Sequence, residues 1–245
     1  MRNSYKKIEI NCAKNTHENV FSLINKNTDI SIVDIPSGYG AFILRLKDHG
    51  YKNITAIDIE NILKIKHANF STGDMTKTLP MKDNSIDTLV CIDGIEHIDG
   101  QFKFIKEVAR ILKTNGELVI STPNISSLRS RWRWLMTGHH NKCKSPLDEK
   151  NPTPLHHIGM ISFPEIRYLL HTNGLIINQI STNRIKSISW LYSIITPLSF
   201  LYTSLTYRKT GNKENTKVIN QEVKKSMFSL PVLFGETLII RAIKK

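Results

Sequence analysis

Short apolar runs alternate with helical patterns of apolar and polar residues over the first half of the chain. Residues 30–35 form a β-branched run, a turn with two glycines follows, and residues 41–48 carry apolar side chains at helical spacing. The alternation continues with strand patterns at 53–57, 86–92 and 117–121 and with helical patterns at 16–26 and 102–112, the last of them ended by Asn115 and Gly116. Strands that alternate with helices predict βαβ units and a parallel sheet covered on both faces.

This regular pattern stops after Thr122. Residues 123–160 contain four prolines, six basic residues between positions 128 and 150, and two tryptophans at 132 and 134, which predicts an insertion or lid. Three arginines alternate with these tryptophans: Arg129, Arg131 and Arg133. They could bind a phosphate or pyrophosphate bidentately, with an indole for stacking. Alternate helical positions point about 200° apart, however, so a solvated basic helix that buries its tryptophans stays an equal alternative.

The alternation of helices and strands resumes at Ser162. Glu165 follows three residues later, which is the spacing of a capping box and predicts a helix that ends near position 173. Strand patterns occur at 175–181 and 236–243, on either side of a long uncharged segment. We expect a single domain over residues 1–245, with a cofactor-binding core at 29–122, the insertion at 123–160, and the uncharged segment at 187–207 inserted before the last strand.

Residues 187–207 contain no charged side chain, and basic residues flank them on both sides. The segment approaches the length of a membrane span, but seven of the 20 residues from 188 to 207 are Ser or Thr, and Pro197 lies near the middle. A single crossing would also separate two strands that we expect in one sheet. Two interpretations remain. One is a helix pair broken at Pro197 that lies in a membrane interface or dips in and returns, which the aromatic residues and flanking cations favour; the other is a hydrophobic helix that covers the substrate pocket.

The chain has 245 residues and a formal net charge of +13, which is unevenly distributed. Residues 29–100 carry 7 basic and 11 acidic side chains, whereas residues 101–245 carry 22 basic and 8 acidic ones. This asymmetry indicates a basic half that faces an anionic partner, either nucleic acid or a membrane surface. The three cysteines exclude a disulfide scaffold and a four-cysteine zinc site. The first residues lack the apolar core of a secretory signal, so we expect a cytoplasmic protein.

Candidate chemistry follows the first strand pattern. Asp34 lies near the end of that strand, and Gly38 and Gly40 lie in the turn before the helix. Glycines there let a ligand approach the backbone, and the start of the helix offers free N–H groups. Asp58 ends the next strand about 20 residues further on, a position suited to the two hydroxyls of a ribose. The spacing predicts a nucleoside-type cofactor. A nicotinamide dehydrogenase would carry a third glycine where this chain has Ile43.

Over roughly residues 30–124, these motifs resemble the class I S-adenosylmethionine-dependent methyltransferases. VDIPSGYG is similar to the cofactor loop of that family, with Pro36 in place of its usual first glycine; AIDIE is similar to the ribose-binding acid, GDM to the acid that contacts the adenine, and IDTLVCIDGIEHI to the fourth strand and its active-site edge. The resemblance implies a Rossmann-like α/β fold with a seven-stranded, mostly parallel sheet, an antiparallel last strand and helices on both faces. It also implies S-adenosyl-L-methionine as cofactor, bound by Asp34, Gly38, Gly40, Asp58, Asp74, Met75 and Asp93.

Asp93, Glu96 and His97 lie at positions i, i+3 and i+4, so their side chains can face one point. The motif is similar to an acid-x-x-Glu-His sequence in the ubiquinone-pathway O-methyltransferases and in the small-RNA 2′-O-methyltransferases; in the RNA group a further histidine is placed as His157 is here. We take Asp93, His97 and His157 as the candidate catalytic residues, with a histidine as the base. The same three residues with Glu96 could ligate a divalent metal. We favour the metal-free interpretation, in which Glu96 and His97 hydrogen-bond the loop and the pocket wall.

These patterns predict a methyltransferase that acts on an oxygen of a membrane-proximal or lipid-linked acceptor, such as a surface-glycan intermediate or a prenylated quinone precursor. A methyl sulfonium is already activated, so the transfer needs alignment and often a base, but no covalent enzyme intermediate. We expect the protein at the inner face of the membrane, on an anionic surface. Two alternatives stay open: a metal-assisted RNA 2′-O-methyltransferase, and a binding protein that keeps the fold without activity.

Overall fold

In the computed structural model, residues 3–66, 68–143, 145–210 and 214–245 are described, so one residue of the 123–160 insertion lies outside these ranges. Within them, seven strands form one sheet in the order β5-β4-β3-β6-β7-β9-β8. The strands are β3 (Ser31–Asp34), β4 (Asn53–Asp58), β5 (Asn69–Thr72), β6 (Ile86–Ile92), β7 (Leu112–Pro123), β8 (Leu175–Thr182) and β9 (Thr237–Lys244). Strand β9 is antiparallel to both of its neighbours, and the other pairs are parallel. The expected Rossmann-like sheet with an antiparallel last strand is confirmed.

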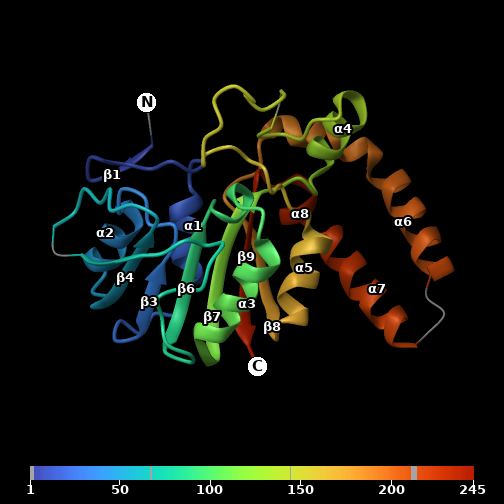
Figure 1. The fold of residues 1–245 in the computed structure, drawn as a ribbon. Helices are drawn as coiled ribbons and strands as arrows, with labels where there is room; N and C mark the ends of the chain where they lie inside the picture. Colours follow the sequence, from blue (N-terminus) through green and yellow to red (C-terminus); the bar gives the residue numbers. More distant parts are fainter. Residues whose placement is uncertain (1–2, 67, 144, 211–213) are drawn as a thin grey trace.

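Helices cover both faces of this sheet (Figure 1). They are α1 (Thr16–Leu23), α2 (Ala41–Asp48), α3 (Gln101–Ile111), α4 (Leu128–Thr137), α5 (Phe163–Thr172), α6 (Thr196–Thr210), α7 (Glu214–Met227) and α8 (Leu230–Phe234), with the 3-10 helices η1 (Ile95–His97) and η2 (Ser187–Ile195). A small antiparallel hairpin of β1 (Ser4–Tyr5) and β2 (Ile8–Glu9) precedes them. Helices α6 and α7 lie beyond α5, at the opposite end of the molecule from α2 and β4 (Figure 1).

Two apolar layers hold the helices against the sheet. On one face, Phe104 and Val108 of α3 and Phe163 of α5 are fully buried in one cluster. On the other face, Val20 of α1 and Phe42 of α2 pack in a second cluster. The central strands lie between the two layers, which explains why their sequences are continuous apolar runs instead of alternating ones.

The boundary between α3 and β7 lies one residue from the expected one. The sequence pattern predicted a helix over 102–112, and α3 ends at Ile111 because Leu112 already pairs with Ile86 of β6. Asn115 and Gly116, which were expected to end the helix, lie within β7. Asn115 instead takes a left-handed conformation with φ 64° within β7, which asparagine tolerates better than most residues. Sequence patterns also missed β5, α7 and α8.

The uncharged segment forms η2 and α6. Pro197 lies in the first turn of α6, where the missing N–H of proline would be unpaired in any case. The break expected near Pro197 is therefore the junction between the two helices. The chain leaves the sheet after β8 and returns to its neighbour β9. A single membrane crossing by η2 and α6 would separate these two paired strands, so their pairing excludes it.

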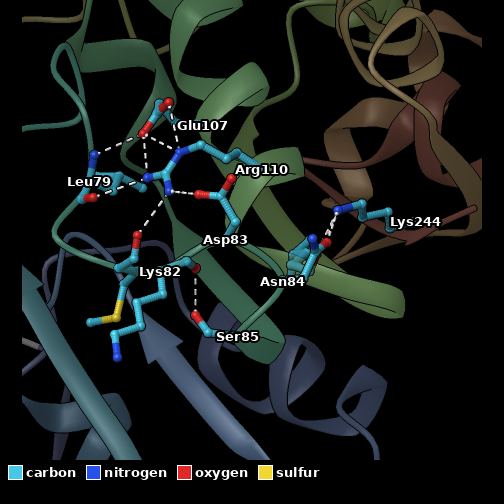
Figure 2. A network of polar contacts seen from close by, with 10 residues as sticks. Leu79, Lys82, Asp83, Asn84, Ser85, Glu107, Arg110 and Lys244 are labelled. Carbon is cyan, nitrogen blue, oxygen red and sulfur yellow. Dashed lines mark hydrogen bonds and ion pairs between the residues drawn. The ribbon is translucent and has the colours of Figure 1, made fainter.

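Arg110 connects α3 to the loop between β5 and β6 (Figure 2). Its Nη2 donates to Glu107 Oε2 at 2.7 Å, and its Nη1 donates to Asp83 Oδ1 at 2.6 Å. The same guanidinium donates to the carbonyl oxygens of Leu79, at 3.1 Å, and Met81, at 2.9 Å. The hydrogen bonds to Glu107 raise the pKa of Arg110. The network therefore holds this loop on α3, and it contains none of the candidate site residues.

Candidate functional site

The order of the strands in the sheet reverses between β3 and β6, because the chain proceeds from β3 towards β5 on one side and then from β6 towards β7 on the other. Ligands of open α/β sheets bind outside the carboxyl ends of the strands at such a point. Asp34 ends β3, Asp58 ends β4, and Asp93 directly follows β6. The fold therefore brings to one edge of the sheet three acids that the sequence pattern selected.

Asp34 and Asp58 form an acid pair at this edge. Asp34 is only 2% exposed, and burial together with the charge of Asp58 raises the pKa of Asp34 well above its ordinary value. Asp58 is half-buried and accepts hydrogen bonds from the N–H groups of Gly38 and Ile59, both at 2.8 Å. Neighbouring carboxylates oppose each other's ionisation. A ligand that brings ammonium or hydroxyl donors would stabilise both.

The glycine loop between β3 and α2 leaves its backbone open to close approach. Gly38 and Gly40 have positive φ values of 50° and 83°. A Cβ atom at position 38 would meet no heavy atom within 4 Å, so the backbone is open there, whereas one at position 40 would lie 3.0 Å from side-chain atoms of Leu63 and Ile65. The hydroxyl of Ser37 is buried and has no hydrogen-bond partner in the described part of the chain. The open backbone at Gly38 and the unpartnered hydroxyl of Ser37 fit a polar ligand held against this loop.

Asp74 and Met75 lie just beyond β5 and have different surroundings. Asp74 Oδ1 accepts from the N–H of Thr76 at 2.8 Å and from its hydroxyl at 2.7 Å, and Lys77 lies 3.2 Å from Oδ2. The hydrogen bonds from Thr76 lower the pKa of Asp74, so the residue is ionised. Met75 is 7% exposed and its side chain packs in the core. Any contact of Met75 with a cofactor therefore falls to its backbone.

Asp93 has a left-handed backbone, with φ 45°. Ser121 Oγ donates to its Oδ1 at 2.6 Å. Burial raises the pKa of Asp93, while the Ser121 hydrogen bond and the charge of Lys142 oppose this rise. The N-terminal segment reaches the same place: the backbone of Ala13 hydrogen-bonds Asp93, and burial with the Asp93 charge raises the pKa of Cys12 to about 12. Cys12 is thus a neutral thiol in the site wall.

Glu96, His97 and His157 form a cluster beside Asp93. One potential ligand atom from each of the three lies within 4.8 Å of the other two, and the rings of His97 and His157 meet edge to face with centroids 4.8 Å apart. Glu96 is fully buried; its Oε2 accepts from the Thr122 hydroxyl at 3.2 Å, and its Oε1 has no partner in the described part of the chain. Of the four residues that the sequence offered as possible metal ligands, Glu96, His97 and His157 lie close enough to share one ion, and Asp93 is their neighbour.

The protonation of this cluster suits acid–base chemistry. Burial and the charge of Asp93 raise the pKa of Glu96 well above its ordinary value. Burial and the neighbouring His97 lower the pKa of His157, so that its imidazole is neutral at pH 7. The Nδ1 of His97 lies 3.2 Å from the carbonyl oxygen of His156, which orients its ring. The cluster can hold a divalent ion or accept a proton, and its geometry is compatible with either role.

The three arginines of α4 do not act as one group. Arg131 is inward: its Nε donates to the Ser126 carbonyl at 2.7 Å and its Nη1 to the Ser199 hydroxyl at 3.3 Å, so it ties α4 to α6. Burial lowers the pKa of Arg131. Arg129 instead lines a cavity of about 150 Å³ behind Asn124, together with Lys142, Lys186 and Glu236. Among the three, Arg129 alone lines this cavity.

The alternative in which α4 buries its tryptophans is wrong. Trp132 is 43% exposed and Trp134 is 54% exposed. Two apolar neighbours on the same helix, Leu135 and Met136, are more exposed still. Leu128 at the start of the helix is buried in the core, whereas the later apolar side chains of α4 face its surroundings.

Several site residues were not indicated by sequence patterns: Ala13, Ser121, Lys142, Lys186 and Glu236. They come from segments far apart in the chain, and none belongs to a recognisable motif. Asn124 carries a usable signal, because it directly follows a buried strand at the carboxyl edge of the sheet. Lys142, Lys186 and Glu236 depend on how the insertion and the segments before η2 and β9 fold back over that edge, whereas Ala13 belongs to the N-terminal segment and Ser121 to β7.

Comparisons with known proteins identify the type of domain. Residues 33–120 match the family described as a methyltransferase domain. An uncharacterised protein of Methanocaldococcus jannaschii is 35% identical over 104 residues, which cover 41% of this chain and 44% of that protein. The ubiquinone biosynthesis O-methyltransferase of Rickettsia bellii is 26% identical over 120 residues, which cover 44% of this chain and 48% of that enzyme. The chain thus spans about half the length of the curated relatives it matches.

Solved structures show the same fold over nearly the whole chain. A SAM-dependent methyltransferase from Archaeoglobus fulgidus superposes with a TM-score of 0.56 at 19% identity, covering 93% of this chain and 92% of that one. At that identity the likeness shows the fold alone. The family match over 33–120 adds the domain type, and S-adenosylmethionine is the cofactor that this family implies.

Proposed function

We propose that this chain, a class I S-adenosylmethionine-dependent methyltransferase by its domain family and its fold, transfers a methyl group to an oxygen of a membrane-proximal or lipid-linked acceptor. The acid pair of Asp34 and Asp58 beside the glycine loop, at the switch point of the sheet, carries the transferase assignment. An exposed apolar stripe close to the same edge of the sheet supports the acceptor class. The two parts are tested separately.

The residues at the switch point fit S-adenosylmethionine, which supplies a methyl group activated on a sulfonium. We assign Asp58 to the ribose hydroxyls, because it is a half-exposed carboxylate at the end of β4. We assign Asp34 to the cationic end of the cofactor, since a positive charge would favour ionisation of this buried acid. Asp74 and the backbone of Met75 remain the candidates for the adenine. Ser37 offers a buried hydroxyl that has no partner within the described residues.

A base near the acceptor oxygen takes up the proton that the hydroxyl loses as the methyl group arrives. His157 suits this role because its lowered pKa keeps the imidazole neutral, and its buried Nδ1 has no hydrogen-bond partner among the described residues. His97 packs against the ring of His157 and is held by the His156 carbonyl. Asp93 lies beside them, fixed by Ser121. We assign proton uptake to His157, and orientation of the acceptor to His97 and Asp93.

Cofactor binding tests the transferase part. S-adenosylmethionine should raise the melting temperature of the protein, because a ligand that binds only the folded state stabilises it by mass action, about 2.7 kcal/mol at a hundredfold excess over Kd. The Asp58→Asn variant should weaken binding by about tenfold or more, since a charge-assisted hydrogen bond is lost. Asp29→Asn, which changes an exposed acid outside the site, is the matched control. A wild-type protein that S-adenosylmethionine does not stabilise would contradict the assignment.

Helices η2 and α6 present the apolar stripe. Leu191, Ile194 and Leu198 follow each other at helical spacing and are 70%, 83% and 69% exposed. Contacts of η2 with the rest of the protein include Ser189, which is buried, and Trp190, which is 49% exposed and stacks on Phe234 with centroids 4.7 Å apart. Residues 187–209 are the one helical stretch of the described chain that is long and apolar enough to cross a membrane, and only 6% of its apolar window is buried. A position in a membrane interface fits this exposure better than a lid does.

The neighbouring helices support contact with an anionic surface rather than insertion through a bilayer. Helix α7, which returns the chain towards the sheet, carries five charged residues among its 14, so it is too polar to cross back. Arg208 and Lys209 end the apolar segment, and Lys224 of α7 lies over the ring of Phe200. Basic side chains beside an apolar stripe add about 1 kcal/mol each at an anionic leaflet.

Vesicle binding tests this second part. The protein should sediment with vesicles that contain anionic lipid, less with neutral vesicles, and less again as salt rises, because exposed charges are screened. Sedimentation that is equal on neutral and anionic vesicles, or absent from both, would contradict a membrane-proximal acceptor. Cofactor binding would be unaffected by that outcome.

The cluster of Glu96, His97 and His157 favours a second candidate function, a metal-assisted 2′-O-methyltransferase acting on RNA. Two imidazoles and a carboxylate within 4.8 Å match the ligand types of a divalent transition metal. In that case activity would depend on the metal, and RNA binding would weaken with salt in proportion to the phosphates contacted. A chelated enzyme that keeps full activity on a non-RNA acceptor would dismiss this candidate.

A further inference from the structure

A small cavity lies between the insertion at 123–160 and the segments that lead into η2 and β9. Its lining includes Asn124 at the end of β7, Arg129 of α4, Lys142, Lys186 before η2, and Glu236 before β9. The volume is about 150 Å³, several times the roughly 30 Å³ that one water occupies in the liquid. The cavity is therefore large enough for the polar group of a ligand.

Cations outnumber acids in this lining, three to one. Glu236 is the carboxylate: Lys186 Nζ lies 2.6 Å and Lys142 Nζ lies 3.5 Å from its Oε1, while Arg184 Nε lies 2.6 Å from its Oε2. These cations lower the pKa of Glu236 to about 2, so it is ionised at neutral pH. One carboxylate cannot neutralise all of them, and the cavity keeps a net positive charge.

Two polar groups in the lining lack protein partners. The guanidinium of Arg129 is half-buried and makes no hydrogen bond or ion pair within the described residues. Asn124 is 4% exposed, and its amide nitrogen donates to the carbonyl oxygens of Pro231, Val232 and Gly235 at 3.0 to 3.1 Å. These three bonds fix the orientation of the amide, and its Oδ1 is buried without a partner in the described part of the chain. The guanidinium of Arg129 can donate two parallel hydrogen bonds, and Asn124 Oδ1 can accept one. Together they indicate a ligand with anionic oxygens and a hydroxyl.

The cavity adjoins the candidate catalytic cluster through Lys142. The charge of Lys142 acts on Asp93, Glu96 and His157, and its backbone hydrogen-bonds His157. A group bound in the cavity would therefore lie next to the residues assigned to the acceptor. Ser189 of η2 also lines the cavity, so the cavity borders the apolar segment as well.

We propose that this cavity binds the phosphate or diphosphate group of a hydroxyl-bearing ester, such as a sugar phosphate, with Arg129, Lys142 and Lys186 on the anionic oxygens and Asn124 Oδ1 accepting from a hydroxyl. That the bound ester is the methyl acceptor rests on the proposed function. The binding itself is independent of methyl transfer. The phosphate ester can be soluble or the headgroup of a lipid, and the same contacts serve both.

Isothermal titration of the full-length protein with glucose 1-phosphate, pyrophosphate, sulfate and glucose, at constant ionic strength, tests the chemistry. Glucose 1-phosphate should bind more tightly than sulfate, and glucose should not bind detectably. Arg129→Gln should weaken glucose 1-phosphate binding by about tenfold or more, because a charge-assisted contact is lost. Glu236→Gln should strengthen it, because the carboxylate in the cavity is removed. Lys103→Gln, an exposed cation on α3, is the matched control and should change nothing.

A second arm separates the two sources of the phosphate. Vesicles that contain phosphatidylinositol, which joins a phosphate to a hydroxylated ring, are compared with phosphatidylserine vesicles of equal charge. A preference for phosphatidylinositol that Arg129→Gln removes would support a lipid headgroup, and tight binding of glucose 1-phosphate without that preference would support a soluble ester. Equal affinities of Arg129→Gln and Lys103→Gln for glucose 1-phosphate, with both variants folded by their melting temperatures, would overturn the proposal. Since no S-adenosylmethionine is present, that result would leave the methyltransferase assignment standing.

Discussion

Replacing the apolar stripe by serine tests the proposed membrane docking separately from cofactor binding. The triple variant Leu191→Ser, Ile194→Ser and Leu198→Ser changes three side chains that are about three quarters exposed. Exposed positions contribute little to folding, so the melting temperature should stay close to that of the wild type. S-adenosylmethionine binding should also be unchanged, because none of the three residues lies at the switch point.

The size of the expected effect follows from the exposed area. Full burial of a Leu or Ile side chain contributes about 1.5–3 kcal/mol relative to exposure in water. Since these side chains are roughly three quarters exposed, and an interfacial helix buries about half of its surface, each contributes about 0.5–1 kcal/mol. The three together give about 1.5–3 kcal/mol, which corresponds to a loss of roughly 10- to 140-fold in the vesicle partition coefficient.

Sedimentation with anionic vesicles over a range of lipid concentrations measures this coefficient. A double variant, Phe102→Ser and Tyr168→Ser, serves as control, because both residues are exposed but lie on α3 and α5 away from the stripe. The control should partition like the wild type. If the triple variant also partitions like the wild type, the stripe does not contact lipid, and η2 and α6 have another role.

Three further outcomes follow from single side chains. Arg110→Ala should lower the free energy of unfolding by about 1.5–3 kcal/mol in urea titrations, because several hydrogen bonds to a charged group are lost; an unchanged midpoint would show that the loop is held without it. Burial lowers the pKa of His17 to about 3 from its ordinary 6.5, so protonation favours the unfolded chain. Stability should be full above pH 6.5 and fall as the pH drops towards 3, and His17→Gln should make this dependence shallower; identical slopes would refute it. His157→Gln should lower kcat by about 10²- to 10⁴-fold while S-adenosylmethionine binding is kept; a wild-type rate would exclude His157 as the base.

Local sequence was sufficient to place the residues that we propose to bind the cofactor. Asp34, Gly38, Gly40 and Asp58 are placed by rules that act within a few residues: a β-branched run forms a strand, glycines turn the chain, and an acid ends the next strand. Because parallel strands present their carboxyl ends at one edge, the sequence order of these motifs already implied that they meet. Met75 is the exception, since only the packed core shows that its side chain points inward.

The acceptor half depended on contacts between distant segments. His157 reaches Glu96 and His97 only because the insertion folds back over the end of β6, across some 60 positions of chain. Lys142, Lys186 and Glu236 meet in one cavity for the same reason. No local periodicity encodes such pairs.

The sequence by itself determined the fold class, the cofactor-binding edge and the presence of an uncharged, aromatic-rich segment, because strand runs, glycine turns and charge distribution are local properties of the chain. Tertiary structure alone decided which side chains of that segment are exposed, which of three arginines lines the cavity, and which buried polar groups lack a partner. Those properties depend on the sum of all packing around a residue, and the same local sequence can satisfy or expose a side chain according to what lies against it.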